Sequence, residues 1–148
     1  MLDNAFWEYL LGALGKAGLY QESTQEWLAA SKYPTQVTWN PEVERDFCTF
    51  LNTLAAAIAN ILALPIRRKF TADYCTTKLV GHAAGRKPDI TLFPVGSEPK
   101  DTGRVALWRL VQCCLEMKNS NSASATKDAI IQLAGEPLAC SMSPQYGR

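Results

Sequence analysis

Two short groups of charged residues lie at the ends of predicted strands, and their residue types fit the chemistry of a metal-dependent site. Asp89 opens one predicted strand after Pro88, and Glu116 and Lys118 close another. Because Glu116 and Lys118 are two residues apart on a strand, their side chains leave the same face. Two carboxylates beside a main-chain carbonyl form the oxygen-rich site that Mg²⁺ prefers. A lysine there could orient or deprotonate a water molecule that attacks phosphorus.

An acidic residue from the long helix that precedes these strands could add an outer ligand. Glu42 and Glu44 both lie in the first turn of that helix. We predict Glu44 as the ligand, although the sequence does not decide which of the two faces the sheet. A plain salt bridge between Lys118 and one of the two strand-end carboxylates accounts for the same residues, so this structural interpretation stays open beside the catalytic one.

Positive charge is concentrated just before Asp89. The formal net charge of the whole chain is only +1, which predicts no global attraction to nucleic acid or to an anionic membrane. Residues 65–88 nevertheless contain six basic residues and one acidic residue. A phosphate-contacting rim and a solvated strand edge are both consistent with this concentration. The residues that we predict to bind nucleic acid are Arg67, Arg68, Lys69, Arg86 and Lys87.

The elements that must position these residues follow the order helix, strand, strand, strand, helix. Apolar residues repeat at helical spacing from the N-cap Asn40 to Pro65, which predicts one long helix. The following strands are predicted at 69–77, 89–95 and 105–117. The last is almost continuously apolar, which predicts a central strand covered on both faces. A second helix is predicted at 126–138.

The predicted fold is therefore an α/β (α+β) domain with a three-stranded antiparallel meander between two helices. We assign this domain to residues 39–148. Residues 1–38 are predicted to form a helical N-terminal extension. It contains a helix at 4–20 and a short helix that the capping box at 23–26 begins and Pro34 ends.

Cysteine and histidine content excludes a zinc-binding framework and bears on location. The chain has five cysteines and one histidine, none of them in zinc-ligand spacing. Free thiols in apolar patterns are typical of a reducing compartment. The first residues lack a basic leader, and no run of about 18 apolar residues occurs. We therefore expect a cytoplasmic or nuclear protein without a membrane partner.

The motif formed by Pro88-Asp89 and Glu116-x-Lys118, separated by a turn-containing spacer, resembles that of the PD-(D/E)xK phosphodiesterases, the restriction-endonuclease-like nucleases. The resemblance covers residues 40–135 as an order of elements. It implies that Asp89 and Glu116 are metal ligands, that Lys118 is the catalytic lysine and that Mg²⁺ is the cofactor. That fold usually places a further strand after the second helix. The resemblance therefore implies an incomplete core in a truncated fragment.

A narrower resemblance links the chain to the region that precedes the kinase domain in fungal-type protein kinases. The similar stretches are 86–90 (Arg-Lys-Pro-Asp-Ile), Trp108, Glu116-x-Lys118, 47–52 (Phe-Cys-Thr-Phe-Leu-Asn) and Gln145-x-x-Arg148. No Gly-rich nucleotide-binding loop, H-R-D or D-F-G motif occurs in the sequence. We therefore expect no phosphotransferase machinery in this chain.

Two functions remain open at this point. The first is a metal-dependent nuclease-like site that acts on nucleic-acid phosphodiesters. The second is a non-catalytic accessory domain that binds a protein partner or nucleic acid. The first depends on the convergence of Asp89, Glu116 and Lys118, and the second does not.

Overall fold

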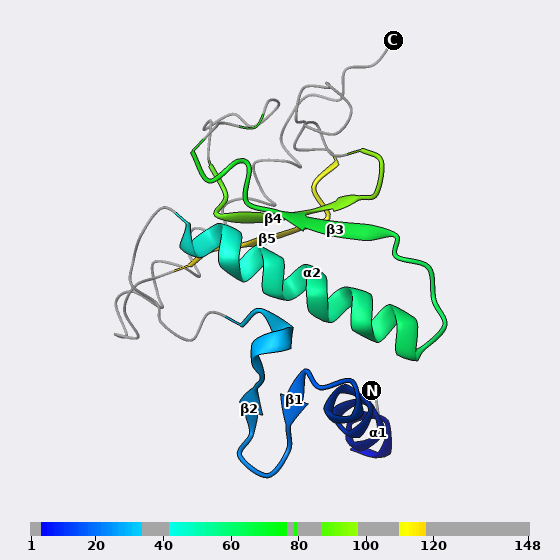
Figure 1. The fold of residues 1–148 in the computed structure, drawn as a ribbon. Coiled ribbons are helices and arrows are strands. Elements are labelled where there is room, and N and C mark those ends of the chain that lie inside the picture. Colours follow the sequence, from blue (N-terminus) through cyan, green and yellow to red (C-terminus); the bar gives the residue numbers. More distant parts are fainter. Residues whose placement is uncertain (1–3, 34–41, 77–78, 80–86, 98–109, 118–148) are drawn as a thin grey trace. The chain divides into compact units, whose positions relative to one another are not determined.

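The protein is described here by a computed structural model that covers residues 4–33, 42–76, 79, 87–97 and 110–117 (Figure 1). These residues form a mixed α/β structure with two α-helices and two small antiparallel sheets. The backbone divides into two compact units, Met1–Arg67 and Arg68–Arg148. No helix within the described residues is long and apolar enough to cross a membrane.

Helix α1 (Asn4–Lys16) confirms the first predicted helix and ends four residues before the predicted end at residue 20. Its last turn is closed by two backbone hydrogen bonds, from Gly18 N–H to Gly15 O at 2.9 Å and from Leu19 N–H to Leu14 O at 3.0 Å. Gly18 has a φ of +71°, a conformation that glycine adopts without a steric cost. This turn brings Leu19 back against Leu14 in the buried cluster of the first unit.

The prediction that a short helix begins at the capping box (residues 23–26) is wrong. Strand β1 (Tyr20–Gln21) pairs antiparallel with β2 (Glu26–Trp27), so the capping-box residues lie in the hairpin turn and at the start of β2. Tyr20 and Trp27 are directly paired, and their ring centroids lie 5.1 Å apart. Both rings pack against the buried cluster formed by Leu10, Leu14 and Leu19. Serine and threonine favour turns as well as helix starts, so the capping-box residues are compatible with either structure. The aromatic cross-strand pair stabilises the hairpin.

The chain continues from the hairpin into the short 3₁₀ helix η1 (Ala29–Ser31) and, after residues 34–41, into helix α2 (Val43–Ile61). Helix α2 confirms the predicted long helix, whereas its predicted N-cap Asn40 lies outside the described residues. The apolar face of α2 completes the buried cluster of the first unit. The α2 residues packed against this cluster are Leu54, Ala57, Ile58 and Ile61.

Helix α2 also ends in a two-bond cap. Leu64 N–H donates to Ala59 O at 2.8 Å, and Ala63 N–H donates to Asn60 O at 3.2 Å. Ala63 has a φ of +52°, although this position in the cap usually carries glycine. Pro65 then follows and prevents the helix from continuing.

The second unit contains the predicted three-stranded antiparallel meander. Its strands are β3 (Arg68–Thr71), β4 (Ile90–Pro94) and β5 (Cys113–Leu115), in the spatial order β3-β4-β5. Strand β3 is shorter than predicted because the chain turns after Thr71. Asp73 N–H donates to Thr71 Oγ1 at 3.2 Å, and Cys75 N–H donates to Ala72 O at 3.2 Å.

The prediction that residues 105–117 form the central strand is wrong for the part of the chain that the structure describes. Strand β4 lies between the other two strands, and its Ile90 and Phe93 are fully buried. Strand β5 has three residues, the first of which, Cys113, is exposed. Leu110 and Val111 lie outside β5 and pack against the buried cluster that contains Phe93. An apolar run thus contributes to the core without forming a long strand.

Several further predictions fall on residues that the structure does not describe. They concern Lys118, Arg86, Trp108 and the second helix at 126–138. The domain boundary predicted between residues 38 and 39 also falls there and stays a prediction. The restriction-endonuclease-like arrangement depends on these residues and stays a prediction. The described residues establish a mixed α/β fold with an antiparallel meander.

Candidate functional site

Asp89 and Glu116 lie at the same end of the second-unit sheet. Asp89 immediately precedes β4, and Glu116 immediately follows β5. The ladder pairs Ile90 with Leu115, so Asp89 and Glu116 each lie one residue beyond this last ladder pair. The two predicted metal ligands therefore belong to the same end of the sheet.

A hydrogen bond holds Asp89 against the chain that carries Glu116. The Asp89 Oδ2 atom accepts it from the Met117 backbone N–H at 2.6 Å. A charged acceptor makes such a bond shorter and stronger than a bond between neutral groups. Both acidic side chains are half-buried. The carboxylate of Asp89 thus continues the contact between β4 and β5 one step beyond the regular ladder.

The third member of the predicted catalytic set, Lys118, lies outside the described residues. It follows Met117 directly in the chain, so its backbone begins one residue beyond the hydrogen bond to Asp89. Its role as the catalytic lysine stays a prediction.

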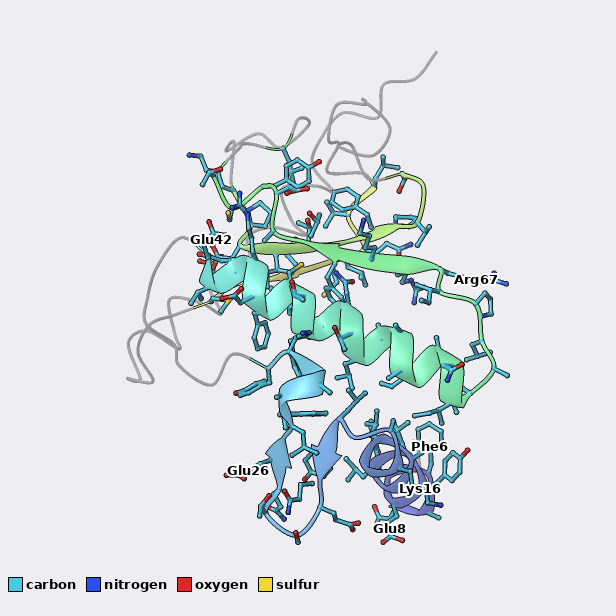
Figure 2. The ribbon with its side chains drawn as sticks, in the orientation of Figure 1. Phe6, Glu8, Lys16, Glu26, Glu42 and Arg67 are labelled. Carbon is cyan, nitrogen blue, oxygen red and sulfur yellow. The ribbon has the colours of Figure 1, made fainter. Side chains whose placement is uncertain are left out.

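The two acidic residues at the start of α2 differ in their surroundings. Glu42 is exposed and forms an ion pair with Arg45, with its Oε1 and Oε2 atoms 2.8 and 3.0 Å from Arg45 Nη1 (Figure 2). Glu44 is half-buried, and its Oε2 atom is buried without a hydrogen-bond partner. A buried carboxylate oxygen without a donor is costly. Glu44 is therefore the better ligand candidate of the two. Because it belongs to the first unit, its role as an outer ligand stays a prediction.

Within the described residues, no group of three or more histidine, cysteine, aspartate or glutamate side chains is placed to hold a metal ion. The sheet end offers the carboxylates of Asp89 and Glu116. One or two carboxylates are the usual protein contribution to a Mg²⁺ site, in which water and substrate phosphate complete the octahedron. The described donor set therefore fits Mg²⁺ and does not fit a closed structural metal centre.

The predicted nucleic-acid contacts are divided between two ends of the second-unit sheet. Arg68 pairs with Pro94 and Lys69 with Phe93, at the end of β4 away from Asp89. Pro94 lies five positions after Asp89 in the sequence, which corresponds to about 17 Å along a strand. Lys87, by contrast, is exposed and precedes Asp89 by two residues. Arg68 and Lys69 belong to the basic region that precedes Asp89 in the sequence. In the structure, however, they do not lie beside the carboxylate of Asp89.

Arg67 is the last residue of the first unit and is exposed on the stretch between α2 and β3 (Figure 2). Arg86 lies outside the described residues. The binding of nucleic acid by these basic residues stays a prediction.

One functional group was missed by reasoning from the sequence, the backbone N–H of Met117. Nothing in the residue type of Met117 identifies it, because any residue other than proline offers the same donor. Its importance comes from the register of β4 and β5 alone. A further detail that follows from register is the buried Thr91, whose hydroxyl donates to Thr71 O at 3.3 Å.

Comparison with protein-family models, with curated proteins and with solved structures gives no match for this chain. The resemblance to the PD-(D/E)xK nucleases, and to the region that precedes fungal-type kinase domains, therefore rests on the motif residues alone. The geometry adds one independent element, the hydrogen bond that the Met117 backbone N–H donates to Asp89.

Proposed function

We propose that this chain carries a metal-dependent phosphodiesterase site of the PD-(D/E)xK nuclease type, at the sheet end that carries Asp89 and Glu116. The hydrogen bond between Asp89 Oδ2 and Met117 N–H is the main support, since it holds one carboxylate against the segment that bears the other. In this proposal the chain corresponds to the region that precedes the kinase domain in fungal-type protein kinases. Its substrate class is nucleic acid.

The proposed roles follow from the chemistry of each side chain. Asp89 and Glu116 would hold Mg²⁺ through carboxylate oxygens. A bound Mg²⁺ would supply charge neutralisation on the phosphate and lower the pKa of a coordinated water. Lys118 would orient the attacking water by donating a hydrogen bond to it.

A nuclease assay tests this proposal. The protein is incubated with single- and double-stranded DNA and RNA in the presence of Mg²⁺ or Mn²⁺, beside the variants Asp89→Asn, Glu116→Gln and Lys118→Ala. Cleavage should fall by at least about 100-fold in each variant, because each removes a charge from the proposed site. Glu22→Gln, in the turn of the first-unit hairpin, is the matched control and should keep full activity. Absent cleavage, or equal cleavage by all of these proteins, would remove the nuclease proposal.

The alternative is a non-catalytic accessory domain that binds a protein partner or nucleic acid. One observation favours it: Oδ2 of Asp89 already accepts the hydrogen bond from Met117, as a purely structural aspartate would do. This alternative assigns Asp89 to stability alone. Asp89→Asn separates the two functions, because asparagine retains an acceptor oxygen but loses the negative charge that a cation requires. A stable Asp89→Asn protein that binds its partner normally would support the accessory domain.

A further inference from the structure

The segment Leu64–Lys69 runs from the end of α2 into the first two residues of β3. It combines exposed apolar side chains with consecutive basic ones, of which Arg67 is labelled in Figure 2. Leu64 and Ile66 are 58% and 52% exposed. They are followed by three exposed basic residues, Arg67, Arg68 and Lys69. No acidic residue occurs in the sequence between Asp46 and Asp73.

The exposure of Leu64 is not a consequence of the helix cap. Leu64 follows α2 at the position that Leu19 occupies after α1, since both donate the outer hydrogen bond of a two-bond cap. The residue at this position often packs back against its own helix. Leu19 does so and is 8% exposed, whereas Leu64 is 58% exposed. The cap and Pro65 instead hold Leu64 in a defined backbone conformation with its side chain in water.

The second unit has one more exposed apolar side chain just after the end of β4. Val95 is 54% exposed and directly follows Pro94, the ladder partner of Arg68. Within the described residues, six large apolar side chains are exposed. Two of them, Leu64 and Ile66, belong to this segment, and a third, Val95, directly follows the ladder partner of Arg68.

Contact with phosphates at the candidate catalytic site does not explain this segment, because Arg68 and Asp89 lie at opposite ends of β4. A nucleic-acid backbone requires the basic residues and gives no reason for neighbouring aliphatic side chains to stay in water. A phospholipid surface accounts for both features. Basic side chains are attracted to anionic headgroups, and exposed aliphatic side chains enter the apolar layer beneath them. We propose that Leu64–Lys69 docks peripherally on a membrane surface that contains anionic phospholipid, a local partner that the near-neutral net charge of the whole chain did not predict.

Vesicle sedimentation tests this docking with the full chain. Binding to vesicles of equal parts phosphatidylcholine and phosphatidylserine is compared with binding to phosphatidylcholine alone. The protein should sediment with the mixed vesicles only. Two variants address the two features of the segment separately, Leu64→Ser/Ile66→Ser and Arg67→Gln/Arg68→Gln/Lys69→Gln. Each should lower the vesicle partition coefficient by at least about tenfold.

The matched control is Trp7→Ser/Tyr9→Ser, which removes two aromatic side chains of α1 that are 49% and 57% exposed. It should leave vesicle binding unchanged. All the substituted side chains are exposed, so thermal unfolding should confirm that every variant remains folded. The proposal is overturned by absent binding to the mixed vesicles or by an equal loss in the control. It is also overturned if the Leu64→Ser/Ile66→Ser variant binds the mixed vesicles as well as the unchanged protein does. The same holds if the basic residues bind duplex DNA and this binding does not depend on Leu64 and Ile66.

Discussion

Asp89 and Met117 join two strands just beyond the last regular ladder pair, through a 2.6 Å hydrogen bond from the Met117 backbone N–H to Asp89 Oδ2. A side chain here does what a backbone carbonyl does inside the sheet. The same carboxylate is a proposed metal ligand, so its structural and chemical roles must be separated by experiment.

We expect Asp89→Ala to lower the free energy of unfolding by about 1–3 kcal/mol, because the half-buried Met117 N–H loses a charged acceptor. Asp89→Asn keeps an oxygen at the same position and should cost less than about 1 kcal/mol. Urea denaturation followed by circular dichroism measures both values. Equal losses for the two substitutions would contradict a stabilising role for this hydrogen bond.

The two helix caps predict opposite effects for exchanging glycine and alanine. Ala63 has a φ of +52° and Gly18 a φ of +71°. Ala63→Gly should raise the free energy of unfolding by up to about 1 kcal/mol, because it removes the steric cost of the left-handed conformation. Gly18→Ala should lower it by about 1 kcal/mol for the same reason. Thermal unfolding of the two variants gives the sign, and a decrease for both would show that Ala63 is not left-handed.

Gln25 provides a test of the hairpin against the helix that the capping box predicts. It has a φ of +58° in the turn between β1 and β2. Gln25→Gly should therefore leave stability unchanged or raise it by up to about 1 kcal/mol. In the first turn of a helix the same substitution would lower stability by up to about 1 kcal/mol. Urea denaturation distinguishes the two structures through the sign of this change.

Phe93 and Cys113 test which strand is the central one. Phe93→Ala should lower the free energy of unfolding by about 3–5 kcal/mol, because Phe93 is fully buried on β4. Cys113→Ala should change it by less than about 0.5 kcal/mol, because Cys113 is exposed on β5. Chemical denaturation measures both. A large loss of unfolding free energy in Cys113→Ala would instead support the prediction that the apolar run forms a strand covered on both faces.

The sequence predicted those elements whose pattern reflects burial over a few consecutive residues. Helix α2 follows from apolar residues at helical spacing up to Pro65, and β4 follows from a short extended run after Asp89. The pairing of Asp89 with Glu116 as candidate ligands also came from the sequence, as two acids at the ends of neighbouring strands. Residue type and spacing are sufficient for these inferences because they depend on local geometry.

Which residues meet across the chain depends on packing between distant segments. The register of β4 on β5 sets Asp89 against Met117 N–H, and the register of β3 on β4 places Arg68 at the opposite end of the sheet. The Tyr20–Trp27 contact likewise stabilises a hairpin where the capping box predicted a helix. The physical reason is common to these cases: hydrogen bonds and ring contacts between distant residues are chosen by the free energy of the whole packed unit. A local pattern of residue types does not encode that choice.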